Sequence, residues 1–176
     1  MRDLKITPGV IPNCAEIVEL AIKYADRFRD YPDPSAVRRR GPNWDPFNPY
    51  RDSEYEDDDQ YHVLQGADMP DDLRAAVLRG IAPNGLQLKS FYVQINRYDV
   101  GDYVLPHRDT MQQGLYMLTS SDRNALVVQD ATGRPVRIPD RAGTYITHDP
   151  SAWHWVDPVV DHVRFTMVTI PALPHP

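Results

Sequence analysis

The sequence predicts a mainly β protein, an antiparallel sandwich or barrel preceded by helices. Two observations favour this class. The 176 residues are 41% hydrophobic, which is enough for one core. From Gln87 onward, short runs rich in Val, Ile, Tyr, Phe and Thr alternate with turn clusters at regular spacing. We therefore expect a single domain over 1–176, with a helical and loop-rich part at 1–86 and a β-rich core at 87–170.

Two helices are predicted before the core. Asn13 is a candidate N-cap with Glu16 three residues later, and apolar residues then recur at helical spacing. This pattern predicts a first helix that ends near Asp30. A second, shorter helix is predicted from Pro70, a residue favoured at helix starts, to Gly80.

The segment between these helices, 30–67, shows no periodicity. It contains six aromatic residues, and this density favours packing over disorder. We expect it to form a lid or a wall of the substrate site, because loops carry specificity on a rigid scaffold. Its acidic run Asp52–Asp59 is typical of a solvated loop. The sequence does not decide whether the neighbouring Arg38–Arg40 meets an acidic substrate or this acidic run.

Composition excludes several classes of protein. The formal net charge of −6 argues against a nucleic-acid partner with a broad basic interface. No apolar run reaches the roughly 18 residues that cross a bilayer, and the first residues lack the apolar stretch of a signal peptide, so we expect a soluble, cytoplasmic protein. The single cysteine excludes an internal disulfide and a thiolate-rich metal site.

The clearest strand is 91–98, and its two faces differ. Phe91, Val93 and Ile95 share one face. Tyr92, Gln94, Asn96 and Tyr98 share the other. A polar, aromatic face suits a barrel that holds a ligand, and it also suits a strand that faces water.

Three residues are candidate metal ligands. His107 and Asp109 lie two apart, so in an extended strand both side chains point the same way. One His-x-Asp pair is expected by chance in this composition, and an ordinary hydrogen-bonded pair is the alternative. His154 adds a second imidazole later in the chain. Two histidines and one carboxylate on one face suit non-haem iron(II), because the opposite positions stay open.

A cationic side chain that could bind an acidic cosubstrate lies ten residues after His154. Arg164 can bind a carboxylate through two parallel hydrogen bonds, and Thr166 lies on the same strand face. A structural salt bridge is the alternative role for Arg164. His62, His148, His162 and His175 have no partner pattern, so we expect them at the surface or behind the site. Trp153 and Trp155 are expected to form a hydrophobic wall.

Two segments together resemble a known family. The segment 98–109 contains a tyrosine, a glycine turn and His-x-Asp, and the segment 143–167 contains a distal histidine followed by Arg-x-Thr. This pattern resembles the iron(II)- and 2-oxoglutarate-dependent dioxygenases, in particular their prolyl-hydroxylase-like branch. The resemblance implies a double-stranded β-helix, a jelly roll of the cupin-like kind. It also implies that His107, Asp109 and His154 hold Fe(II), and that Arg164, Thr166 and Tyr98 hold 2-oxoglutarate.

The activity implied by the resemblance is hydroxylation of an unactivated carbon, with succinate and CO2 as co-products and ascorbate as the candidate reductant. The substrate would be an amino acid, a peptide or a small natural product. A cupin-like metal-binding or sensing module without 2-oxoglutarate turnover is the alternative. The sequence does not predict the oligomeric state.

Overall fold

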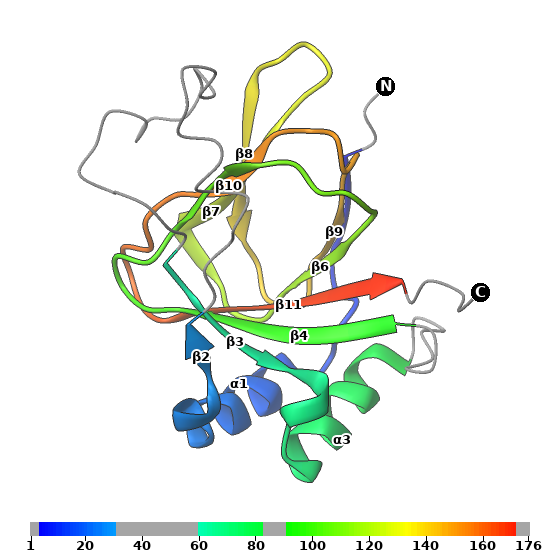
Figure 1. The fold of residues 1–176 in the computed structure, drawn as a ribbon, viewed down its shortest axis with the longest axis vertical. Coiled ribbons are helices and arrows are strands. Elements are labelled where there is room, and N and C mark those ends of the chain that lie inside the picture. The colour runs from blue at the N-terminus through cyan, green and yellow to red at the C-terminus, as the bar shows by residue number, and fades with distance from the viewer. Residues whose placement is uncertain (1–3, 31–59, 83–90, 172–176) are drawn as a thin grey trace.

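The computed structural model describes residues 4–30, 60–82 and 91–171, and within them two antiparallel β-sheets face each other (Figure 1). The seven-stranded sheet has the order β1 (Lys5–Thr7), β9 (Tyr145–Thr147), β6 (Gly114–Met117), β11 (Arg164–Pro171), β4 (Phe91–Tyr98), β3 (His62–Gln65) and β2 (Arg29–Asp30). The four-stranded sheet has the order β5 (Val104–His107), β10 (His154–Val156), β7 (Ser121–Gln129) and β8 (Pro135–Asp140). This double-sheet arrangement is the predicted jelly roll.

Two helices, α1 (Cys14–Lys23) and α3 (Asp71–Ile81), cover the outer face of the large sheet (Figure 1). Apolar side chains of both helices pack against the same strands. The buried residues of this layer include Ile17, Ala21, Leu73, Ala76, Val77, Val93, Ile95, Phe165 and Met167. The helical layer fixes the large sheet from outside and leaves its inner face to the site.

The first helix is shorter than predicted. It ends at Lys23, and a short 3₁₀ turn, Ala25–Arg27, leads into β2 rather than continuing to Asp30. Asn13 precedes the helix, but its side chain donates to Glu16 Oε2 at 2.9 Å and to the Ala76 carbonyl at 3.0 Å. It therefore ties α1 to α3 instead of capping α1. The second helix begins and ends within one residue of its prediction.

Strand β4 has its predicted bounds, and its faces separate as expected. Val93 and Ile95 pack under the helices. Gln94, Asn96 and Tyr98 face the space between the sheets, where they line a cavity. The polar face of this strand is thus turned toward a possible ligand and not toward bulk water.

The N-terminal part supplies three strands that the pattern did not predict, β1, β2 and β3. They contain three, two and four residues, which is too short to show alternation. Most of the expected lid, with its acidic run and Arg38–Arg40, lies outside the described residues. None of the helices that the structure describes is long and apolar enough to cross a membrane.

Candidate active site

The register of the small sheet brings two histidines together. His154 in β10 lies directly opposite His107 in β5, and their ring centroids are 4.0 Å apart. Asp109 follows β5 by two residues, and its backbone N–H donates to the Pro150 carbonyl at 2.8 Å. Its carboxylate oxygens lie 3.7 Å from His107 Nε2 and 3.5 Å from His154 Nε2. One ligand atom from each of the three residues falls within 4.8 Å of the others.

Backbone carbonyls orient both imidazoles. His107 Nδ1 lies 2.9 Å from the Leu105 carbonyl, and His154 Nδ1 lies 3.1 Å from the Ala152 carbonyl. A carbonyl only accepts, so each Nδ1 carries a proton, and each Nε2 faces Asp109. In the neutral form of both rings, these Nε2 atoms are the ones that could bind a cation.

A third imidazole stands behind this group. His148 is buried, and its ring packs 4.3 Å from the His154 ring. Its Nδ1 lies 3.0 Å from the Asp149 carbonyl, so it too is oriented by the backbone. The sequence placed His148 only at the surface or behind the site, whereas the structure makes it a neighbour of His154 and part of the cavity wall.

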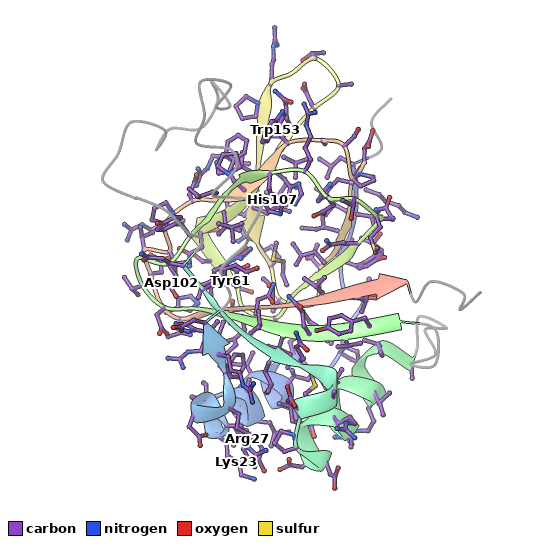
Figure 2. The ribbon with its side chains drawn as sticks, viewed as in Figure 1. Lys23, Arg27, Tyr61, Asp102, His107 and Trp153 are labelled. Carbon is purple, nitrogen blue, oxygen red and sulfur yellow. The ribbon has the colours of Figure 1, made fainter. Side chains whose placement is uncertain are left out.

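The cavity between the sheets encloses about 360 Å³ and joins the histidine group to Arg164 on β11. Figure 2 shows that His107 lies in the part of the molecule away from Lys23 and Arg27, which mark the helical end. Tyr61, the end of the long aromatic segment, lines the cavity and stacks on Tyr98 with ring centroids 5.2 Å apart.

At the far end of the cavity, Arg164 is fully buried and already paired. Its Nε donates to Asp140 Oδ2 at 2.7 Å, and its Nη2 donates to Asp140 Oδ1 at 3.1 Å. The Tyr98 ring centroid lies 4.8 Å from Cζ. Burial alone lowers the pKa of the Arg164 guanidinium, but Asp140 and Tyr98 outweigh it and raise that pKa above its ordinary value. The guanidinium therefore stays charged.

Two polar atoms at this end have no hydrogen-bond partner among the described residues. They are Arg164 Nη1 and Thr166 Oγ1, and both are buried. Thr166 shares the inner face of β11 with Arg164 and Val168, and the latter two line the cavity. Unpaired buried donors cost free energy, and because Arg164 lines the cavity, a ligand acceptor bound there could satisfy them.

The paired edge of Arg164 departs from the sequence expectation. The two parallel bonds predicted for a cosubstrate are made to Asp140, as in the structural salt bridge named as the alternative. Asp140 is the last residue of β8, two positions from the buried Ile138, so strand alternation turns it inward.

A second group of metal-ligand residues lies outside the cavity wall. His62 Nε2 is 3.6 Å from Asp99 Oδ2 and 3.6 Å from Asp102 Oδ2, and its Nδ1 is 2.8 Å from Asp30 Oδ1. Arg97 also pairs with Asp99, at 2.7 Å. No sequence pattern pointed to this group, because His62, Asp30 and the turn that holds both Asp99 and Asp102 are distant from one another in the chain.

Comparison with known proteins finds likeness in structure but not in sequence. No family model matches the chain, and no curated protein matches its sequence. Among solved structures, a prolyl hydroxylase from Trichoplax adhaerens in complex with a hypoxia inducible factor peptide fragment matches with a TM-score of 0.67. It is 11% identical, and the match covers 97% of this chain and 84% of that one.

Two further structures agree. A Pseudomonas putida prolyl-4-hydroxylase matches with a TM-score of 0.59 at 15% identity, over 96% of this chain and 92% of that one. HygX from Streptomyces hygroscopicus, with nickel, 2-oxoglutarate and hygromycin B bound, matches with a TM-score of 0.57 at 10% identity, over 96% and 82%. An epimerase and a carbocyclase of nogalamycin biosynthesis, both described as dependent on alpha ketoglutarate, also match.

The chain has the fold of the 2-oxoglutarate- and iron(II)-dependent oxygenases. The residues of this oxygenase fold fit both groups that its name implies. His107, Asp109 and His154 offer two nitrogen donors and one oxygen donor, a set that suits ferrous iron. The unpaired Arg164 Nη1 and Thr166 Oγ1 suit a carboxylate at the other end of the same cavity.

Proposed function

We propose that the protein is an iron(II)- and 2-oxoglutarate-dependent oxygenase that hydroxylates an unactivated carbon of an amino acid, a peptide or a small natural product. One observation carries the proposal. A single cavity is lined at one end by His107, Asp109 and His154 and at the other by Arg164. Metal ligands and a buried cation at opposite ends of one cavity suit a small acidic chelator between them.

His107, Asp109 and His154 would hold the metal on one side and leave its other positions open to the cavity. When bound, iron and 2-oxoglutarate would activate dioxygen, with one oxygen atom going to the substrate and the other to the succinate that forms from 2-oxoglutarate with loss of CO2. The backbone carbonyls of Leu105 and Ala152 accept from the Nδ1 atoms, so that in each neutral imidazole Nε2 is the nitrogen that would bind the metal. This chain's task at that end is to fix three donors before the metal arrives.

Arg164 Nη1 and Thr166 Oγ1 would donate hydrogen bonds to the far carboxylate of 2-oxoglutarate. Tyr98 packs on the guanidinium and limits its movement. Apolar side chains, among them Leu115 and Ile146, line part of the cavity. Their low polarity would strengthen charged hydrogen bonds made beside them.

The polar face of β4 is the candidate substrate wall. Gln94 Nε2 donates to Asn96 Oδ1 at 2.7 Å, and both amides line the cavity with Tyr61. The side-chain amide atoms of Gln94 and Asn96 that this hydrogen bond does not use can recognise a polar substrate. Structural neighbours described with a peptide and with hygromycin B support both substrate classes.

Mass spectrometry tests the proposal. A library of amino acids, peptides and natural products is incubated with the protein, iron(II), ascorbate and 2-oxoglutarate, and products with one added oxygen atom are sought. We expect one such product with stoichiometric succinate. Metal binding with no succinate under any condition would contradict turnover and favour the cupin-like binding or sensing module. An anaerobic visible charge-transfer band on adding iron(II) and 2-oxoglutarate separates the two earlier.

A further inference from the structure

Asp140 fills the edge of Arg164 that a ligand carboxylate would use. The Nε and Nη2 atoms form a fork to its two oxygens at 2.7 and 3.1 Å, which is the strongest arrangement between a guanidinium and a carboxylate. Asp140 ends β8 in the small sheet, and Arg164 begins β11 in the large one. The pair therefore bridges the two sheets beside the cavity that Arg164 lines.

Charge balance at this end is complete without a ligand. Arg164 contributes one positive charge and Asp140 one negative charge, and side-chain exposure is 1% for each. An acidic ligand would add a second negative charge to the same buried region. Since buried charges interact strongly, the two carboxylates would compete for one guanidinium.

Orientation of Arg164 does not depend on Asp140 alone. The Tyr98 ring lies against the guanidinium, and Nη2 also lies 3.5 Å from Met117 Sδ. These contacts remain when the Asp140 charge is removed. Neutralising Asp140 therefore removes mainly the negative charge that balances Arg164. It leaves the guanidinium freer to pair with a ligand.

We infer that Asp140 is an internal counter-ion that competes with the acidic cosubstrate for Arg164. It keeps the guanidinium paired when the cavity holds no ligand, and it lowers the affinity for a dicarboxylate. This inference rests on the proposed function for the identity of the ligand. Asp140 is a positioning residue, because it acts through Arg164.

The test is Asp140→Asn in the full chain loaded with Mn(II), with 2-oxoglutarate binding measured by calorimetry. We expect binding about tenfold tighter than in the wild type, equivalent to about 1.4 kcal/mol. The ligand-free variant should melt at a lower temperature, and 2-oxoglutarate should raise that temperature more than it does in the wild type. 2-Oxobutanoate, which lacks the distal carboxylate, should bind both proteins equally.

Asp157→Asn is the matched control. Asp157 is a buried carboxylate that pairs with Arg137 and accepts from Trp155 Nε1, away from Arg164. Its loss should leave the 2-oxoglutarate affinity unchanged. Equal or weaker binding by Asp140→Asn would overturn the inference, and it would leave the proposed function standing because the wild type still binds. No binding by either protein would overturn both.

A measurement on the wild type covers the case in which Asp140→Asn does not fold. The ligand 2-oxoglutaramate replaces the distal carboxylate with a neutral amide. If Asp140 balances Arg164, the two ligands should differ less than tenfold in affinity. A preference of 100-fold or more for the carboxylate would show an uncompensated guanidinium and overturn the inference.

Discussion

Two groups of histidine and aspartate in this molecule offer similar ligand atoms and differ in everything around them. In the group of His107, Asp109 and His154, backbone carbonyls hold both imidazoles. In the group of His62, Asp99 and Asp102, another carboxylate, that of Asp30, holds the imidazole. The first group lines an enclosed cavity and the second lies at the surface edge of β3 and the turn after β4.

The two groups also differ in the side chains that surround their carboxylates. Arg97 makes a forked pair with Asp99, so one carboxylate of the surface group is already neutralised. Both histidine Nε2 atoms lie within 3.7 Å of the Asp109 carboxylate. Similar ligand types therefore stand in different surroundings in the two groups. The imidazoles held by backbone carbonyls and the adjoining cavity favour the first group as the metal site.

The largest expected effect comes from removing a ligand of the first group. His154→Ala should lower metal affinity by at least about 100-fold, since even changes to residues that only support ligands cost 10–100-fold. Calorimetry with Mn(II) measures it. His62→Ala is the matched control and should keep the wild-type affinity and a stoichiometry of one. If replacing His62 lowered the number of Mn(II) ions bound per protein, the surface group would also bind metal and the distinction between the groups would be wrong.

Arg164→Ala tests the other end of the cavity. We expect 2-oxoglutarate binding to weaken by about 2–5 kcal/mol, the scale for truncating one partner of a hydrogen-bonded charge pair, while metal binding stays intact. The variant should also lose about 3–5 kcal/mol of stability, because Asp140 is left buried and unpaired.

The surface arginine supplies the contrast. Arg97→Ala removes a partly exposed pair with Asp99, and exposed pairs contribute about 0–1 kcal/mol. Denaturant unfolding of both variants measures the difference. Equal stability losses would contradict the burial argument, and an unchanged 2-oxoglutarate affinity in Arg164→Ala would refute its anchoring role.

His148→Ala should have an intermediate effect. His148 packs on His154 and is not one of the three candidate ligands. We therefore expect metal affinity to fall by about tenfold, the low end of the range for residues that support ligands. His148→Phe keeps a ring in the same place and should restore most of the affinity. If both variants lose the metal equally, His148 acts through its nitrogen atoms and not through packing.

The sequence predicted the parts of the site that depend on local pattern. Alternation along β4 predicted the polar face, and the spacing of His107 and Asp109 predicted two candidate ligands on one side, which the structure brings close together. The sequence could not predict the pairing of Arg164 with Asp140, because that contact joins strands of different sheets. His148 was expected at the surface or behind the site, and its contact with the His154 ring depends on the turn from β9 to β10.

The smallest expected effect lies in the surface group and depends on pH. Burial raises the pKa of the Asp102 carboxyl above its usual value. The fold therefore favours the protonated form. This contribution to stability is complete below the unfolded pKa and is lost as the pH rises through the folded one. Asp102→Asn, which stays neutral, should gain stability relative to the wild type between pH 4 and pH 7 in urea unfolding.

Asp130→Asn is a control of opposite sign for that measurement. Thr132 and neighbouring backbone N–H groups lower the pKa of Asp130, so the wild type gains stability from this residue as its carboxyl ionises. The asparagine variant should therefore lose stability relative to the wild type over the same pH interval. If Asp102→Asn behaved like Asp130→Asn, the carboxylate of Asp102 would be favourably paired when ionised. The surface group would then offer a stabilised anion, and ligand geometry alone would have to support the choice of the first group as the proposed metal site.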